Sequence, residues 1–163
     1  MTEPRLADAQ LAQAVVAEAR TWIGTPFRHR ASVRGAGCDC LGLVRGVWRA
    51  VHGAEPTALP HYPEGWDSAE GEALLHGLEA LLPRAAAPGR AGDVLLFQLQ
   101  RGMPARHLGV QTDTPEGPRF VHAFIGHGVV ESALGGVWAR RVVARFWLRP
   151  VAAPAAGTRG TGV

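Results

Sequence analysis

The sequence contains no lysine, and arginine supplies all 17 of its basic residues. The formal net charge is only +3, and the arginines are scattered along the chain. A nucleic-acid-binding surface needs cations clustered on one face, so this pattern argues against a nucleic-acid partner. The densest run of arginines, RRVVAR at 140–145, is interleaved with valines, which predicts the solvent face of a strand.

Long apolar runs are also missing. No stretch is long enough to span a membrane, so we expect no membrane insertion. The first 23 residues carry Glu3, Asp8 and Glu18 and lack the continuous apolar segment of a secretory signal. We therefore expect a protein that is made in the cytoplasm and acts elsewhere only if something carries it there.

Charged residues make up 19% of the chain and hydrophobic residues 47%, which argues against disorder and allows a real core. The length suits one domain. We assign residues 1–150 to that domain. Residues 151–163 are small and rich in Pro and Gly, which predicts a disordered tail.

The two halves of the domain have different hydrophobic periods. Apolar residues at helical spacing predict three helices. The first covers 8–24, the second begins at Asp39 and ends at Gly53, and the third begins at a cap at Asp67 or Ser68. Residues 25–38 are expected to form a loop. Short strand patterns follow, at 87–99, 107–112, 119–124, 128–134 and 137–148. Helices followed by antiparallel strands predict an α+β fold, with the N-terminal helices packed on a small antiparallel sheet.

Cysteine is nearly absent: Cys38 and Cys40, in GAGCDCLGLV, are the only two. Two are too few for a disulfide framework, and a bond between neighbours at i and i+2 would be strained and easily reduced. A zinc site needs three or four ligands, and zinc-binding cysteine pairs are spaced more widely than this one. We therefore expect neither a metal nor another cofactor.

A nucleophilic role for Cys40 has a physical basis. If Asp39 caps a helix, the Cys40 sulfur lies beside unpaired backbone N–H groups at the positive end of the helix dipole. Both favour the reactive thiolate, and the same amides can receive the oxyanion of an attacked carbonyl. Cys38 precedes the helix and lies outside the electrostatic field of its dipole, so we interpret it as a small side chain that only fills space in the packing. An inert buried thiol is the alternative for Cys40, and the cysteine alone favours it.

Two of the seven histidines are placed to serve a cysteine nucleophile, which needs a base. His107 and His122 flank TPEGP, a hairpin signal. Any register whose paired residue numbers sum to an odd value, such as Thr112 with Arg119, puts both rings on one face. One imidazole can then act as the base while the other orients it. Even-sum registers would separate the rings, and the sequence leaves both kinds open.

Five short motifs, in order, resemble those of the NlpC-type cysteine peptidases, which are cell-wall endopeptidases with a circularly permuted papain-like fold. The motifs are GTPF (24–27), DCLGLV (39–44), PGRAGDVLLF (88–97), HLGVQT (107–112) and FVHAF (120–124). The resemblance implies that Cys40 is the nucleophile, His107 the base and His122 the residue that orients this base.

The resemblance also implies two substrate-binding positions. Asp39 matches the aspartate that helps to hold the free amine of the substrate. Phe27 stands where the family often has a tyrosine whose hydroxyl serves the oxyanion pocket. A phenylalanine cannot donate a hydrogen bond, so amides at the helix start, or another donor, must do more. Leu41 replaces the usual serine.

The implied function is that of a cysteine endopeptidase acting on peptidoglycan stem peptides, typically at the γ-D-glutamyl bond to a diamino acid. Leu41, the short chain and the missing signal peptide make it most similar to the cell-wall peptidases of phage tails and gene transfer agents. Such a virion component would assemble with tail or hub proteins and act in the periplasm of the target cell. We expect it to dock through the connector 54–66, which carries Tyr62 and Trp66, and the helix that follows.

Three other functions stay open. Phe27 favours an inactive structural tail-tip module with the same fold. The same thiol chemistry would serve an amidase or acyltransferase acting on another substrate. Cys38 and Cys40 could also join nearby histidines in a metal-binding module. Thiol alkylation tests for an activated cysteine, and metal analysis tests the last of these functions.

Overall fold

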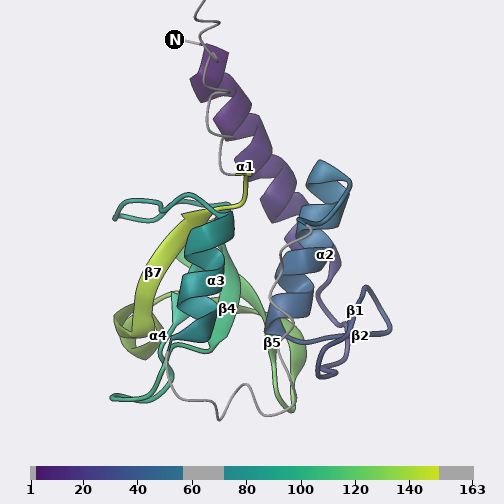
Figure 1. Ribbon diagram of the computed structural model, residues 1–163, viewed down its shortest axis with the longest axis vertical. Coiled ribbons are helices and arrows are strands. Elements are labelled where there is room, and N and C mark those ends of the chain that lie inside the picture. Colours follow the sequence, from purple (N-terminus) through teal and green to yellow (C-terminus); the bar gives the residue numbers. More distant parts are fainter. Residues whose placement is uncertain (1–2, 57–71, 151–163) are drawn as a thin grey trace, which may run out of the picture.

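A computed structural model describes residues 3–56 and 72–150, arranged as helices against one face of a sheet (Figure 1). The helices are α1 (Glu3–Thr21), α2 (Cys40–His52) and α3 (Ala73–Leu81). The strands that follow are β3 (Asp93–Phe97), β4 (His107–Thr114), β5 (Gly117–Phe124), β6 (Gly128–Ala133) and β7 (Val142–Trp147). This arrangement confirms the predicted α+β fold. The predicted tail at 151–163, and Tyr62, Trp66, Asp67 and Ser68, lie outside the described residues.

The second helix forms as its sequence predicts. The Asp39 carboxylate accepts a hydrogen bond from the Gly42 N–H at 2.7 Å, which caps the first turn of α2. Gly53 ends the helix with a positive φ of 87° that favours glycine. Helix α1 ends at Thr21, earlier than predicted, because the chain turns there and the Thr25 N–H bonds to the Trp22 carbonyl.

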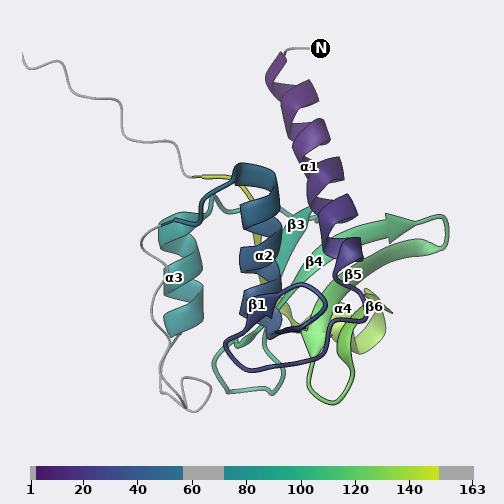
Figure 2. The same cartoon turned by 90° about the vertical axis from the view of Figure 1, so that its right-hand side faces the viewer.

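The sheet is antiparallel, with strand order β6-β5-β4-β3-β7. In the β4–β5 hairpin Thr112 pairs with Arg119, which is the odd-sum register. Alternation along each strand then gives the sheet two apolar faces. One face, with Val94, Leu108 and Val121, packs against the helices, as Figure 2 shows. The other carries a smaller cluster of Leu95, Phe97, Phe120 and Leu134.

The last segment differs from the prediction. Residues 137–148 do not form one strand, because a short helix, α4 (Gly136–Arg141), precedes β7. The strand order explains this: β6 and β7 lie at opposite edges of the sheet, so the chain must cross the sheet between them. Arg140 and Arg141 therefore belong to a helix rather than to the solvent face of a strand. The predicted loop at 25–38 also contains two short strands, β1 (Ser32–Val33) and β2 (Gly37–Cys38).

Candidate active site

Cys40 is the first residue of α2 and is buried, with 7% of its surface exposed. Its neighbour Asp39 is also buried, and both carboxylate oxygens accept backbone hydrogen bonds. Oδ1 accepts from the Gly42 N–H and Oδ2 from the Arg30 N–H, each at 2.7 Å. Asp39 thus fixes the start of α2 and ties it to the preceding loop, whatever it contributes to substrate binding.

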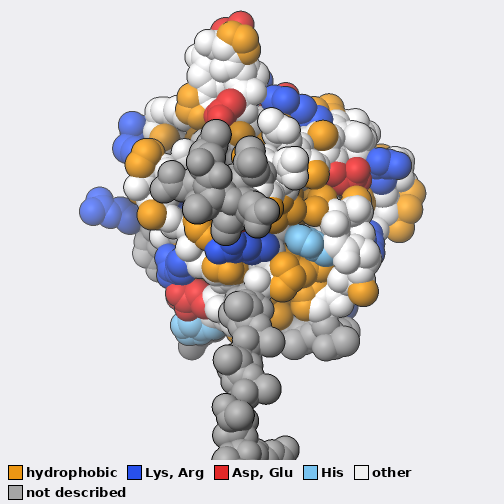
Figure 3. Space-filling model, turned by 90° about the horizontal axis from the view of Figure 1, so that it is seen from above, with side chains coloured by type: hydrophobic (Ala, Val, Ile, Leu, Met, Phe, Trp, Pro, Cys, Tyr) orange, Lys and Arg blue, Asp and Glu red, His pale blue; other side chains and the backbone are white. Residues whose placement is uncertain are grey.

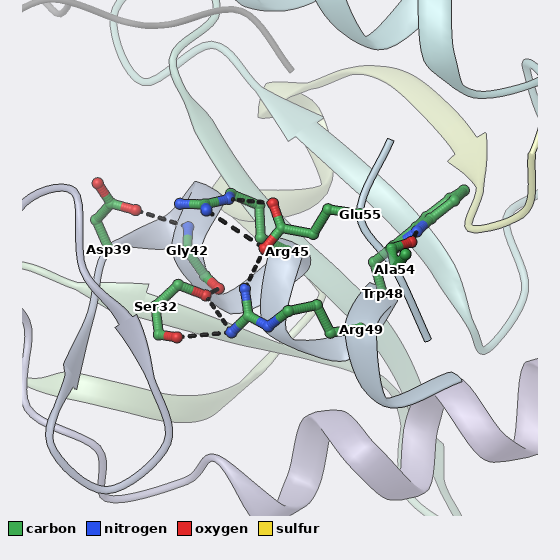
Figure 4. Close-up of polar contacts among 8 residues, drawn as sticks. All are labelled: Ser32, Asp39, Gly42, Arg45, Trp48, Arg49, Ala54 and Glu55. Carbon is green, nitrogen blue, oxygen red and sulfur yellow. Dashed lines mark hydrogen bonds and ion pairs between the residues drawn. The ribbon is translucent and has the colours of Figure 1, made fainter. Parts of the chain in front are cut away.

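A polar network holds this loop against the helix (Figure 4). The Ser32 hydroxyl donates to the Gly42 carbonyl at 2.5 Å, and Arg49 Nη2 donates to the Ser32 carbonyl at 2.6 Å. The Glu55 carboxylate pairs with Arg49 and, at 2.9 Å, with Arg45 Nε. The network therefore connects successive turns of α2 to the loop that leads into Cys40.

Gly42 permits the close approach on which this network depends. A Cβ atom at this position would lie 1.9 Å from the Ala31 carbonyl oxygen, a distance that real structures do not tolerate. The loop could not then lie so close to the helix start.

His107 and His122 are joined directly, since Nε2 of His107 lies 2.8 Å from Nδ1 of His122. Both side chains are buried, and the odd-sum register places them on the same face of the sheet. The Cys40 sulfur lies 3.8 Å from the carbonyl oxygen of Arg106, the residue before His107. The structure therefore joins His107 to His122 and places the Cys40 sulfur beside the backbone of the residue that precedes His107.

Ser132 extends this group, and the sequence analysis missed it. Its Oγ lies 2.9 Å from Nε2 of His122, from the neighbouring strand β6. In the structure Ser132 pairs with Phe120, which lies two residues before His122, so all three side chains lie on the same face of the sheet. The alternation of residues along the two strands would have indicated Ser132 once the register of β5 and β6 was known. If His122 donates to Ser132 and accepts from His107, the Nδ1 atom of His107 keeps the free lone pair that a base needs.

Burial keeps both imidazoles neutral. Loss of water contact, with a smaller effect of His122, lowers the pKa of His107 to about 3. Burial, with a smaller effect of His127, lowers the pKa of His122 to about 4. At neutral pH the site therefore holds an uncharged base.

The prediction that the helix start favours the Cys40 thiolate is wrong. Burial and then the Asp39 carboxylate raise the pKa of Cys40 to about 12, against the opposing effect of backbone groups of Leu108 and Leu41. The neutral His107 offers no positive charge to offset this. Burial and Asp39 likewise raise the pKa of Cys38 to about 12, so both thiols are shifted in the same direction by the same causes. The resting site is a neutral thiol beside a neutral imidazole.

Phe27 lies beside the loop that carries the cysteines. It forms a parallel bridge with Cys38, supported by hydrogen bonds from the Arg28 N–H to the Cys38 carbonyl (2.9 Å) and from the Cys38 N–H to the Pro26 carbonyl (3.0 Å). Its half-buried ring packs against the main core and supplies no hydrogen-bond donor.

The described residues show three further features that bear on function. Within them, no cluster of three or more His, Cys, Asp or Glu side chains is arranged to hold a metal ion. None of the helices in this part of the chain has the length and apolar character needed to cross a membrane. On the face shown in Figure 3, the described arginines are spread among apolar and uncharged residues.

No protein-family model and no curated protein matches this sequence. Solved structures do match. An NLP/P60-family lipoprotein-like protein from Staphylococcus aureus has a TM-score of 0.57 at 18% identity, over 85% of this chain and 41% of that one. The NlpC/p60 domain of the peptidoglycan hydrolase SagA has a TM-score of 0.51 at 24% identity, over 83% and 97%. An N-acetylmuramoyl-L-alanine amidase from Bacteroides uniformis has a TM-score of 0.53 at 12% identity, over 84% and 97%.

These likenesses show that the chain has the NlpC/P60 fold, which confirms the resemblance found in the sequence motifs. The chain spans less than half of the Staphylococcus aureus protein but nearly all of the SagA domain and the Bacteroides amidase.

Proposed function

We propose that this protein is a cysteine hydrolase of the bacterial cell wall and a member of the NlpC/P60 family. One observation carries the proposal: two buried histidines are hydrogen bonded to each other, and the residue before one of them contacts the sulfur of Cys40, the first residue of α2. Support comes from the fold, which the chain shares with proteins described as a peptidoglycan hydrolase and an amidase.

The neutral resting site dictates the order of proton movements. Cys40 attacks a carbonyl carbon of the substrate while His107 removes the thiol proton, because a free thiolate is not stable there. Backbone amides at the start of α2 stabilise the oxyanion. His107 then gives its proton to the departing amine, leaving a thioester on Cys40. Water, deprotonated by His107, hydrolyses the thioester and restores the thiol.

His122 and Ser132 act through His107. Their hydrogen bonds hold the imidazole in the tautomer whose Nδ1 can accept a proton. When His107 becomes charged during the reaction, His122 accepts the Nε2–H hydrogen bond and stabilises the cation.

For the substrate we propose a peptidoglycan stem peptide, cut at the γ-D-glutamyl bond to a diamino acid, with Asp39 contributing to recognition of the free amine and Phe27 lining the pocket. The second candidate is an amidase that releases the stem peptide from the glycan, favoured by the Bacteroides neighbour. Mass spectrometry of purified peptidoglycan digested with the protein separates them. The endopeptidase exposes an amine on the diamino acid, and the amidase exposes one on the first residue of the stem peptide.

The matched control for this digestion is the Cys40→Ala variant, which must release nothing. If the wild-type protein releases no fragment from any wall preparation, the fold serves an inactive module, as the missing hydroxyl at Phe27 would favour. If Cys40→Ala cuts as well as the wild type, the assignment of the nucleophile is wrong.

We also propose that the protein is carried by a phage-like tail to the target cell and acts in its periplasm. The proposal rests on the departure of Leu41 from the usual serine and on the similarity to tail-borne peptidases described above. Immunodetection of the protein on purified particles tests it. A protein found only in the free cytoplasmic fraction would contradict this route.

A further inference from the structure

The path from β6 to β7 carries α4 over the two histidines. The chain leaves β6 at one edge of the sheet and enters β7 at the other, and residues 134–141 make the crossing. Gly136, at the start of α4, has a positive φ of 52°, a backbone conformation that favours glycine. At the far end, the Gln98 N–H donates to the Arg141 carbonyl at 2.8 Å and fixes the helix above β3.

Trp138, in the middle of α4, covers the histidine pair. Its ring centroid lies 5.2 Å from that of His122 and 5.8 Å from that of His107. Phe97 and Phe120 hold the indole in place, with edge-to-face contacts at 5.3 Å and 5.1 Å. Trp138 is itself half-buried, whereas both histidines are buried beneath it.

We propose that Trp138 is a positioning residue that excludes water from the His107–His122 hydrogen bond and thereby keeps the pair neutral and aligned. The effect of Trp138 on catalysis rests on the proposed function. The exclusion of water by Trp138 does not depend on that function. The indole N–H is a donor only, so it cannot accept the hydrogen bond that water accepts from a charged imidazole. Its removal would admit solvent to both rings, and solvent favours the protonated form.

Few other charges face the pair. His127, in the β5–β6 turn, stacks on Phe124 at 5.6 Å, and its proximity adds to the effect of burial in lowering the pKa of His122. Arg141 lies over the outer face of Trp138 at 5.6 Å. On the side of α2, the Cys40 sulfur contacts the Arg106 carbonyl beside His107, and the Asp39 carboxylate lies at the helix cap. Apolar rings therefore surround the pair, with Trp138 as the one that α4 contributes beside Phe97, Phe120 and Phe124.

NMR titration of the histidine side chains in the unreacted protein tests the proposal. In the wild type, His107 and His122 should remain neutral at pH 5. In Trp138→Ala both titrations should move upward by about one unit or more, because desolvation by burial commonly shifts a pKa by several units. Trp138→Phe should restore most of the wild-type behaviour. If Trp138→Ala does not fold, Trp138→Leu, which covers less of the pair, serves as the same test.

The matched control is Trp147→Ala. Trp147 lies on β7 between Arg90 and Arg149, at 5.0 Å and 4.0 Å from its ring, and contacts neither histidine. This variant should leave both titrations unchanged. Unchanged titrations in a folded Trp138→Ala protein would overturn the proposal, as would equal shifts in Trp147→Ala.

The hydrolysis rate gives a second readout. In Trp138→Ala the ratio of kcat/KM at pH 5 to that at pH 8 should fall, since His107 would be partly charged at the lower pH. A shift in the NMR titration without any wall hydrolysis in the wild type would support the role of Trp138 and contradict the proposed function. If the wild type hydrolyses the wall, but Trp138→Ala changes neither the histidine titrations nor the ratio of kcat/KM at the two pH values, the proposed function is supported and the role of Trp138 is contradicted.

Discussion

The Nε2 atom of His107 lies 2.8 Å from the Nδ1 atom of His122, and both rings are buried beneath Trp138. A hydrogen bond between two neutral imidazoles needs one donor and one acceptor, so it couples the tautomers of the two rings. Ser132 Oγ, at 2.9 Å from Nε2 of His122, extends the pair into a chain, and when His122 donates to Ser132 it accepts from His107. The pair is thus prepared to accept one proton, at His107, and to do so only during the reaction.

The two histidines should differ in their importance. His107→Ala should lower kcat/KM for wall hydrolysis by about 10²–10⁴-fold, the usual contribution of a general base. His122→Ala should cost less, and His122→Gln should retain more activity than His122→Ala because its amide can still accept the His107 hydrogen bond. Kinetics on defined muropeptides measure this. His52→Ala, at a histidine that bonds to the Leu148 carbonyl away from the site, is the control. Equal losses in His52→Ala and His107→Ala would contradict the assignment.

Ser132 should affect the rate of hydrolysis through the tautomer of His122. Ser132→Ala removes one hydrogen bond of about 1 kcal/mol, which corresponds to a loss of kcat/KM of roughly fivefold to tenfold. Ser132→Thr keeps the hydroxyl and should recover most of the rate. The ¹⁵N chemical shifts of His122 report the tautomer independently of activity. Identical shifts in wild type and Ser132→Ala would show that this hydroxyl does not set the tautomer.

The depressed pKa values also predict how stability depends on pH. In the unfolded chain each histidine takes up a proton near pH 6.5, whereas His107 in the folded protein does so only near pH 3. The unfolded state therefore binds more protons between these values, so the free energy of unfolding falls as the pH drops from about 6.5 toward 3. From pH 7 to pH 5 the loss due to His107 alone should be about 2 kcal/mol.

Urea unfolding at the two pH values measures this loss. The double variant His107→Gln/His122→Gln lacks the buried imidazoles and should lose less stability over the same interval. Equal losses in the two proteins would mean that these histidines are not buried and neutral in solution.

Gly42 should be essential to the start of α2. Gly42→Ala places a Cβ atom against the Ala31 carbonyl and should cost about 1–3 kcal/mol of stability, the usual range for overpacking. The rate of hydrolysis should fall by more than the loss of stability explains, because the displacement of the backbone at Gly42 also moves Cys40, two residues earlier. Gly135→Ala is the control, since a Cβ atom there meets nothing within 4 Å and φ is an ordinary −143°. Circular dichroism melts and kinetics on both variants check this, and a fully active Gly42→Ala protein would contradict it.

The parts of this fold that depend on local patterns could be predicted from the sequence. Asp39 caps α2 because a carboxylate at that position satisfies a free amide wherever the helix lies, and the hairpin at TPEGP follows from its turn residues. The register of that hairpin, which places His107 and His122 on one face, was left open by the sequence. Strand pairing at long range could not be predicted. The position of β7 beside β3 forces α4 to cross the sheet, and the local sequence of VWARRVVARFWL carries no sign of this.

The charge state of the site also depends on long-range packing. The helix start predicts a thiolate at Cys40 when the rest of the protein is ignored. Burial under the sheet and its loops reverses this, and Trp138, which was expected on a strand, is part of the cover over the base. Ser132 was missed for a related reason, because its contact with His122 exists only once β5 and β6 are paired.

The central claim is that Cys40 forms a thioester with a wall peptide. Acid quenching of the protein during turnover of muropeptides, followed by peptide mapping with mass spectrometry, tests it most directly. We predict an acyl adduct on Cys40 and none on Cys38, with no adduct and no hydrolysis in Cys40→Ala. Hydrolysis that persists in Cys40→Ala, or an adduct carried by Cys38, would contradict the account.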